Sequence, residues 1–430
     1  MGDRLQDGSR VCIIGGGPAG SFAALHLLRL ARERSLHLEV EIFEPRDGRI
    51  QGPRSCKGCA GILSHGAVHN LASLGLQTPP EVVQSELRSY VVHVQNQAAT
   101  VDQPHRERRI LSVYRGAGPR LRPGPSLAGF DAWLLDQARA AGARVIPTYV
   151  RRVAWDGRPI IYGDAAPIAA DLLVLAIGVN SRHPLSSKFE YAPPQTAIMA
   201  QDEIVRPASW PDGKVAGFFG GLPGLVFGAL VPKGPYLNVS LLWPGAEADA
   251  IVRFYTAHAQ ALARFFAERP ASLCGCLPLI AVRPARTYFG DRWVAVGDAA
   301  VTRLYKDGIN SAFLTAGAAM AAAVEVGTTA AAFAAAYAPA CRQLAADNRY
   351  GELIFRTCQL ALQSSLLARA CIGCVRAEAG GQTARRIFSR LVWGMLTGDE
   401  SYRDLFRLLL SPVAWSRLAR EAARVLRERR

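Results

Sequence analysis

The apolar and polar positions near the start of the chain predict a strand, a loop, a helix and a second strand. Residues 10–14 (RVCII) form a short apolar run typical of a buried strand, and residues 21–34 place apolar side chains such as Leu28 at helical spacing. Residues 37–44 (HLEVEIFE) alternate in polarity and end on a glutamate. Together they form one strand–loop–helix–strand unit of an α/β domain.

The pattern changes along the rest of the chain. Residues 130–142 (FDAWLLDQARAAG) predict an amphipathic helix that ends at a glycine, while residues 171–177 (DLLVLAI) and 293–296 (WVAV) predict buried strands. Residues from about 191 to 278 hold strand-like runs between Pro and Gly turns, which favours a second domain built on a sheet. Residues 382–430 predict helices. A chain of 430 residues can form two or three such domains.

The loop between the first strand and the first helix carries a phosphate-binding pattern. Gly15, Gly17 and Gly20 form G-x-G-x-x-G. The first glycine permits a tight turn, the second lets the backbone approach a pyrophosphate, and the third lets the helix pack closely. Glu44 follows 24 residues after Gly20, at a strand end where a carboxylate can bind ribose hydroxyls. A glycine-rich turn without a ligand is the alternative. The predicted dinucleotide contacts are Gly15, Gly17, Pro18, Ala19, Gly20, Glu44, Pro45 and Arg46.

A later strand end indicates which dinucleotide this is. Residues 297–300 (GDAA) follow a buried strand and run toward a helix, an arrangement typical of FAD proteins. On this motif, GGGPAG, Glu44, residues 130–142 and residues 286–300, the sequence resembles the flavoprotein superfamily of aromatic hydroxylases and geranylgeranyl reductases. The resemblance covers about residues 10–320. It implies a bound FAD, a Rossmann-type domain, and a mixed-sheet substrate domain that roofs the flavin. It also implies flavin contacts at Gly297, Asp298, Gly308, Ile309 and Asn310.

We expect a discontinuous domain organisation. Three segments build the FAD-binding domain, two build the substrate domain, and one forms the helical C-terminal region. In that order, the segments are 1–75, 121–182 and 281–345; 76–120 and 183–280; and 346–430.

Two closely spaced cysteines occur in the segment 54–63 (RSCKGCAGIL). Geranylgeranyl reductases carry a Cys-Gly-Gly-Gly segment beside the flavin at this place, so the resemblance implies a flavin-side loop with contacts at Cys59, Ala60 and Gly61. Either Cys59 or Cys56 could be the family's cysteine, and both are candidate catalytic residues. Three alternatives stay open: a metal site completed by residues 371 and 374, a redox-active disulfide, and small residues that only pack. No metal is expected.

The chain departs from its relatives at three places. Ile177 and Gly178 stand where hydroxylases have an Asp-Gly pair, which argues against an NAD(P)H-driven monooxygenase. Residues 227–232 (FGALVP) replace the reductases' Tyr-x-Trp-x-Phe-Pro segment and predict an apolar pocket of different shape. Lys306 follows the GDAA motif and is a third catalytic candidate, because a cation could stabilise an anionic reduced flavin. An exposed pair of Lys306 with Asp307 is the alternative.

Charge and composition bear on partners. The chain has a net charge of +15 and nine cysteines. No signal peptide or nucleic-acid motif is recognisable, so a reducing cytoplasm is expected and nucleic acid is not. Residues 385–430 carry eleven arginines against five acidic residues, with Trp393 and Trp415 among apolar positions. These helices fit an anionic membrane surface, or a cap packed on the core.

The combined prediction is an FAD-dependent oxidoreductase. It would transfer hydride or electrons between the flavin and a hydrophobic substrate, either an isoprenoid lipid or a quinone, at a membrane surface. The electron donor stays open between NAD(P)H and an electron-transfer protein. A monooxygenase and an electron-transfer subunit of a larger complex are the alternative functions.

Overall fold

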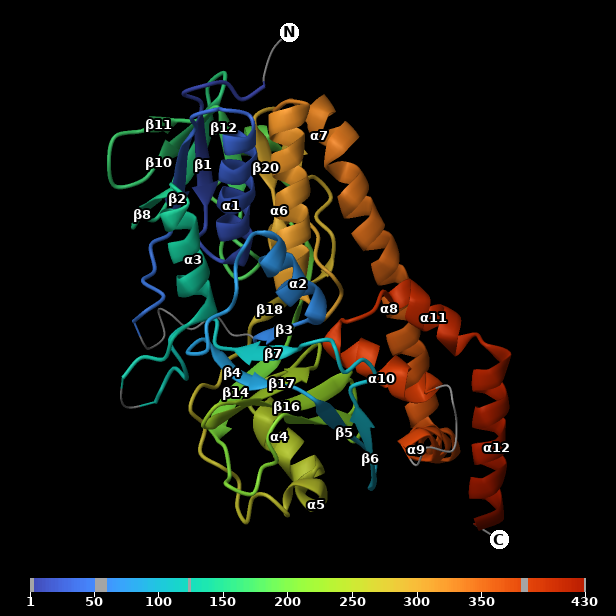
Figure 1. Ribbon diagram of the computed structural model, residues 1–430. Helices are drawn as coiled ribbons and strands as arrows, with labels where there is room; N and C mark the ends of the chain where they lie inside the picture. The colour runs from blue at the N-terminus through green and yellow to red at the C-terminus, as the bar shows by residue number, and fades with distance from the viewer. Residues whose placement is uncertain (1–3, 51–59, 123–124, 380–385, 429–430) are drawn as a thin grey trace.

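The computed structural model describes residues 4–50, 60–122, 125–379 and 386–428. Two large sheets lie one above the other, with the N-terminal domain at the top of Figure 1 and the C-terminal helices along one side. Between the two sheets lies a small three-stranded sheet, in the order β3 (Ile62–Leu63), β7 (Leu111–Val113) and β4 (Val83–Glu86).

The first large sheet is parallel except at one edge. Its core strand β1 pairs with β2 and β12 in parallel, and Ile14 lies opposite both Phe43 and Leu175. The strands in spatial order are β19 (Phe289–Gly290), β20 (Trp293–Ala295), β12 (Leu172–Leu175), β1 (Arg10–Ile14), β2 (Glu39–Phe43) and β8 (Arg144–Ile146). The helices packed around it are α1 (Pro18–Glu33), α3 (Phe130–Ala140), α6 (Gly308–Glu325) and α7 (Ala330–Ala336). Buried aliphatic runs without alternation explain why β1 and β12 are central strands.

The second large sheet is mostly antiparallel and belongs to the other domain. Its strands in spatial order are β14 (Ala200–Val205), β17 (Tyr236–Leu242), β16 (Phe227–Lys233), β15 (Lys214–Phe219), β5 (Ser89–Val94) and β6 (Gln97–Asp102). Helices α4 (Ala250–Ala257) and α5 (Ala259–Leu262) cover its outer face through one apolar cluster that includes Phe218 and Phe254. The opposite face, called the inner face below, is turned toward the small three-stranded sheet and the first domain (Figure 1).

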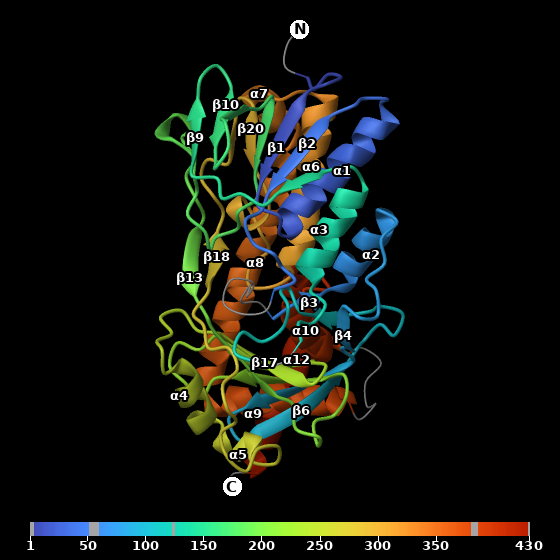
Figure 2. The same cartoon turned by 90° about the vertical axis from the view of Figure 1, so that its left-hand side faces the viewer.

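Smaller elements complete the two domains. Figure 2 shows β13 and β18 running along the side that joins them. These elements are α2 (His65–Ser73), β9 (Arg152–Trp155), β10 (Pro159–Tyr162), β11 (Ile168–Ala169), η1 (Ser187–Phe189), β13 (Gln195–Ile198), β18 (Leu279–Arg283) and η2 (Gly297–Ala299).

The C-terminal helices pack on the second domain. They are α8 (Ala338–Gln363), α9 (Ser365–Ala379), α10 (Ile387–Thr397), α11 (Tyr402–Leu409) and α12 (Pro412–Glu428). Trp393 on α10 is fully buried and meets Tyr90 of β5 edge to face, with 5.4 Å between ring centroids. Helix α10 is followed by Gly398 as its C-terminal cap, whose φ of +79° favours glycine. The helices thus support the second sheet at β5 and β6.

The predicted fold class is confirmed: the chain is an α/β protein with a Rossmann-type domain, a mixed-sheet domain and a helical C-terminal region. The six segment boundaries remain a prediction. Most apolar side chains of the C-terminal region belong to the core; of those predicted to face a membrane, Leu410 and Trp415 are exposed. Within the described residues, no single helix is long and apolar enough to cross a membrane. Helices α8 and α9 would qualify together, with a bend of 115° between them.

Candidate dinucleotide site

The glycine loop leaves no room for side chains at two of its three glycines. Gly15 has a φ of +105°, and a Cβ there would lie 2.6 Å from the carbonyl oxygen of Ala176. A Cβ on Gly20 would collide with the carbonyl oxygen of Gly15. At Gly17 the nearest atom to a Cβ would be 3.6 Å away, an ordinary contact. The chain itself therefore requires glycine at positions 15 and 20, but not at 17, where approach of a pyrophosphate gives the reason.

Glu44 is held against this loop. One carboxylate oxygen accepts from the backbone N–H of Gly16 at 3.0 Å, and the other accepts from the N–H of Arg46 at 3.0 Å. Because β1 and β2 are parallel neighbours, their carboxyl ends bring the loop and Glu44 together. The carboxylate is half-buried, and an ionised carboxylate is the kind of acceptor to which ribose hydroxyls donate.

Arg115 is a site residue that the sequence did not assign. Its guanidinium pairs with both carboxylate oxygens of Asp131 at 3.0 and 2.8 Å, and Asp131 is buried in the first turn of α3. The atom 3.6 Å from the Cβ position of Gly17 is Nη2 of Arg115. Oδ2 of Asp131 is 3.8 Å from the same position, so the structure places the Arg115–Asp131 ion pair beside the place where a pyrophosphate would come. The density of Gly and Arg in residues 114–120 marks this loop in the sequence, but it does not show that Arg115 pairs with Asp131, 16 residues later in α3.

Asp298 lies across from the glycine loop. It belongs to η2, next to Gly297, whose Cβ position would lie 2.7 Å from the Cβ of Ala19. The N–H of Gly297 donates to Thr315 Oγ1 at 2.9 Å, which fixes this turn on α6. Burial raises the pKa of Asp298, while Thr302 and Arg115 favour its charged form. The starts of α1 and η2 therefore converge at the carboxyl edge of the first sheet.

The predicted flavin contacts at the start of α6 have defined places. Gly308 begins the helix, and the side chain of Ile309 is buried in the core, so only its backbone could meet a ligand. Asn310 donates to Asp307 at 2.9 Å and accepts from Asn70 at 2.7 Å, so its amide is already held. Asp307 adopts φ +62° as the residue before the helix. Its pKa is raised to about 6 by burial.

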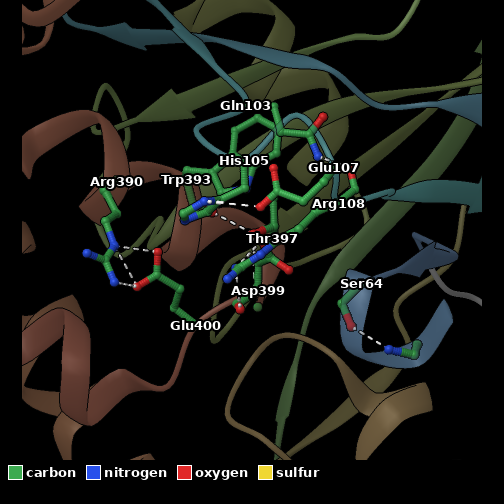
Figure 3. A network of polar contacts seen from close by, with 12 residues as sticks. Ser64, Gln103, His105, Glu107, Arg108, Arg390, Trp393, Thr397, Asp399 and Glu400 are labelled. Carbon is green, nitrogen blue, oxygen red and sulfur yellow. Dashed lines mark hydrogen bonds and ion pairs between the residues drawn. The ribbon is translucent and has the colours of Figure 1, made fainter. Parts of the chain in front are cut away.

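The C-terminal region holds the loop that leads to α6. Arg303 donates to the carbonyl oxygen of Gly398 at 3.2 Å, and the hydroxyl of Tyr402 donates to the carbonyl oxygen of Leu304 at 2.6 Å. The segment just after Gly398 is itself anchored: Figure 3 shows Arg108 on Asp399, and Arg390 on Glu400. Asp399 and Glu400 are almost fully buried at their side chains. The tail therefore helps to position the loop between Asp298 and α6.

Of the three predicted catalytic residues, Lys306 is the one whose contacts the structure describes. The ammonium of Lys306 lies 4.3 Å from the ring centroid of Phe227 on β16, so it reaches the inner face of the second sheet. Cys56 and Cys59 lie outside the described residues. Ala60 is half-buried, and Gly61 has a φ of +64°; a Cβ at Gly61 would collide with the carbonyl oxygen of Val113.

The second cysteine pair is inert in its surroundings. Burial raises the pKa of Cys371 to about 11 and that of Cys374 to about 12, so both are thiols at neutral pH. Among the residues that the structure describes, no group of three or more His, Cys, Asp or Glu side chains could hold a metal. The combination of Cys371 and Cys374 with Cys56 and Cys59 falls partly outside these residues.

A buried ion pair on the second sheet also escaped sequence analysis. Lys233 Nζ lies 3.4 Å from a carboxylate oxygen of Glu203, with the two side chains 1% and 8% exposed. Lys233 is the last residue of β16, directly after the apolar segment 227–232, and Glu203 is on β14. The apolar character predicted for residues 227–232 is found in buried Phe227, Ala229 and Val231, but Lys233 at the end of the same strand and Glu203 two strands away add charge.

The comparisons with known proteins agree with this architecture. No family model matches the chain. A kynurenine 3-monooxygenase from Salinispora arenicola is 29% identical over 345 residues, which are 71% of this chain and 70% of that relative. A geranylgeranyl bacteriochlorophyll reductase-like protein from Thermoplasma acidophilum superposes with a TM-score of 0.66 over 94% of this chain and 99% of that one, at 14% identity.

A third similar protein was solved with its ligands. Klebsiella pneumoniae HpxO, complexed with FAD and uric acid, superposes with a TM-score of 0.58 over 95% of this chain and 99% of that one, at 17% identity. The resemblance stated from the sequence is thus confirmed at the level of the fold. The chain shares its fold with the geranylgeranyl bacteriochlorophyll reductase-like protein and with HpxO, which was solved with FAD.

Proposed function

We propose that this chain binds FAD and is an FAD-dependent oxidoreductase. The observation that carries the proposal is the meeting of the glycine loop, Glu44 and Asp298 at one edge of the first sheet. The fit is tested at Gly17: the chain would accept a methyl group there, so the missing side chain points to a ligand that needs the backbone. Arg115, held by Asp131, adds guanidinium N–H groups from which a pyrophosphate oxygen could accept.

Each of these groups has a task in holding FAD. The amides at the start of α1 and Arg115 would bind the pyrophosphate. Glu44 would bind the adenosine ribose, and Asp298 the ribityl chain. The start of α6 would present backbone to the flavin ring. When bound, FAD supplies the hydride and electron chemistry, whereas the protein binds, orients and excludes water.

The occupancy of this site can be measured directly. We expect the purified protein to release about one FAD per chain on denaturation, or to take up one FAD when it is supplied. A chain that neither retains FAD nor binds it at micromolar concentration would contradict the proposal. Release of FMN alone would show that the site for the adenosine half is wrong.

Within this proposal, the reaction is reduction of a hydrophobic acceptor, an isoprenoid lipid or a quinone. Support comes from the apolar stretch Phe227, Ala229 and Val231 on the inner face of the second sheet. We also propose that the reaction takes place at a membrane surface. The support for this is that the apolar side chains of Leu410 and Trp415 are exposed. The electron donor stays open between NAD(P)H and an electron-transfer protein, and it has to be identified by testing each for reduction of the bound flavin.

A second candidate is a monooxygenase, which the similarity to the kynurenine 3-monooxygenase favours. Ile177 in place of an acidic residue argues against it. The two candidates separate in one experiment: the flavoprotein is reduced anaerobically by light and mixed with a soluble quinone, with a short unsaturated isoprenoid, or with oxygen and an aromatic acid. Reoxidation by the quinone or lipid supports the first candidate. A hydroxylated aromatic product, formed from oxygen by the photoreduced flavoprotein, supports the second.

A further inference from the structure

The inner face of the second sheet is polar at one end. Along β16 the side chains of Phe227, Ala229 and Val231 point to the inner face, because Leu230 between them belongs to the outer cluster. Lys233 continues this alternation. On β14, Ala200 and Ile204 belong to the outer cluster, so the inner residues there are Gln201 and Glu203. The buried polar residues of this face are Gln201, Glu203, Lys233, Asn238 and Ser240.

The inner face of β16 meets the dinucleotide site at both ends. At one end, Lys306 from the loop after Asp298 lies over Phe227. At the other, Lys233 Nζ is 3.3 Å from the Cβ position of Gly61, which lies in the predicted flavin-side loop. A strand whose two ends contact these two segments forms part of the wall between them.

Tyr114 and Arg115 give a third, independent link. The ring of Tyr114 lies 4.8 Å from Lys233 Nζ, and its buried hydroxyl has a raised pKa because of burial and the nearby Glu203. The next residue, Arg115, lies beside Gly17 and pairs with Asp131. Two adjacent residues thus connect the phosphate loop to the ion pair.

The ion pair of Lys233 and Glu203 is buried, which makes a purely stabilising role a weak explanation for it. Lys233 on β16 reaches across β17 to Glu203 on β14, and both charges are taken almost wholly out of water. Desolvation of two charges offsets much of their attraction, so a buried ion pair is weak evidence for a stabilising role. Its charges act at longer range than in water, because the surroundings screen them less.

We propose that the Lys233–Glu203 pair is the charged part of the redox site's wall, and that it sets the electrostatic potential at the flavin. The inference rests on the proposed FAD site. Lys233 favours the negatively charged, reduced state of a neighbouring group, and Glu203 opposes it. Each residue shifts the reduction potential of the flavin through its charge. The two shifts have opposite signs and nearly cancel in the wild-type protein.

The test is the midpoint potential of bound FAD in four proteins, measured by anaerobic titration against reference dyes. We expect Lys233→Met to lower the two-electron reduction constant about tenfold, which is about 30 mV, and Glu203→Gln to raise it by a similar factor. The double variant should return close to the wild-type potential. Lys188→Met, at an exposed position on η1, is the matched control and should leave the potential unchanged.

Opposite signs in the single variants separate charge from structure. A pair that only holds the strands would lower stability in both single variants and leave the potential at the control value, and that result overturns the inference. Shifts in the same direction overturn it as well. If Lys233→Met does not retain FAD, Glu203→Gln decides by its sign, together with Lys233→Arg, which should keep the wild-type potential. A wild-type chain that binds no FAD overturns the proposed function itself, and this inference with it.

Discussion

The two walls of the candidate site are built in different ways. The dinucleotide edge is made mostly of backbone, and Gly15, Gly17 and Gly20 lie within six residues of one another. A side chain at Gly15 or Gly20 would collide with other backbone, and one at Gly17 would stand where a pyrophosphate approaches. The opposite wall is made of side chains, Glu203 and Lys233, that meet only because three strands are paired. A site built of backbone leaves a spacing in the sequence, whereas a site built of distant side chains leaves none.

Gly20→Ala should have the largest effect, because it attacks the backbone-built wall. The added methyl would collide with the carbonyl oxygen of Gly15, and backbone cannot move aside as a flexible side chain can. We expect a loss of about 5 kcal/mol in the free energy of unfolding, at the upper end for one substitution, and no retained FAD. Denaturant unfolding and released flavin measure the two effects.

Gly17→Ala is the matched control for this substitution. A Cβ there meets Arg115 at 3.6 Å, which requires no shift. We expect unfolding within about 1 kcal/mol of wild type, with FAD affinity at least about tenfold weaker since the methyl stands where pyrophosphate approaches. Normal FAD affinity in Gly17→Ala would contradict this, because no ligand would then need the bare backbone at position 17.

The sequence predicted what local rules specify. The apolar run of residues 10–14, the helical spacing of residues 21–34 and the alternation of residues 37–44 predicted β1, α1 and β2. The spacing from Gly20 to Glu44 predicted that a carboxylate would reach the loop. Glu44 does meet the loop, at Gly16. These contacts follow from strand ends of a parallel sheet, which are neighbours whatever the rest of the chain does.

The rest depends on contacts between distant segments. Arg115 lies beside Gly17 because of the path of an irregular loop, which no hydrophobic periodicity predicts. Lys233 meets Glu203 only because β17 pairs with both of their strands. The C-terminal apolar residues show the same limit: an amphipathic helix fits a membrane or a protein surface equally well from its own sequence. Only the position of α10 on β5 shows that Trp393 belongs to the core.

A pair of tryptophans sharpens the contrast between these two readings of the C-terminal region. Trp393 is fully buried against Tyr90, whereas Trp415 on α12 is 55% exposed. We expect Trp393→Ala to lower the free energy of unfolding by about 4 kcal/mol through the cavity that it leaves. Trp415→Ala should change it by less than about 0.5 kcal/mol. Thermal or denaturant unfolding gives both values.

Vesicles extend this pair to the membrane. If the exposed face of α12 binds anionic lipid, Trp415→Ala should weaken sedimentation with phosphatidylserine vesicles, while a Leu277→Ala control, also exposed, should not. Equal binding by all proteins, or none, would leave α12 with a protein-facing or solvent-facing role. Similar stability losses in both tryptophan variants would contradict the packing described for α10.

Asp307 tests the junction between the two walls by pH. Its pKa is raised to about 6 from 3.8 by burial, with Asp399 adding to the rise and Ser64, Arg303 and Asn310 opposing it. The folded chain therefore keeps a proton that the unfolded chain has lost, so this group's contribution falls as pH rises from about 4 to 6. We expect Asp307→Asn to gain up to about 3 kcal/mol relative to wild type over that range.

The comparison must be a difference between the two proteins at each pH. Desolvation lowers the pKa of half-buried His26 and of buried His93 and His258 to about 4, so these histidines destabilise the fold as pH falls, in the opposite sense. They are present in both proteins and cancel in the difference. A difference that stays flat from pH 4 to 7 would show that Asp307 is solvated and the junction is open.

Glu44→Gln should have the smallest effect, and it asks how far the backbone-built wall depends on one side chain. The amide oxygen can still accept from the N–H of Gly16 or Arg46, so the free energy of unfolding should stay within about 0.5 kcal/mol of wild type. The ribose would lose a charged acceptor, worth about 1.4 kcal/mol, or tenfold in FAD affinity. Glu39→Gln, at the exposed first residue of β2, the strand that Glu44 follows, is the control and should bind FAD normally. If Glu44→Gln also binds FAD normally, the glycine loop, Arg115 and the helix ends would suffice, and the carboxylate would serve only to fold the loop.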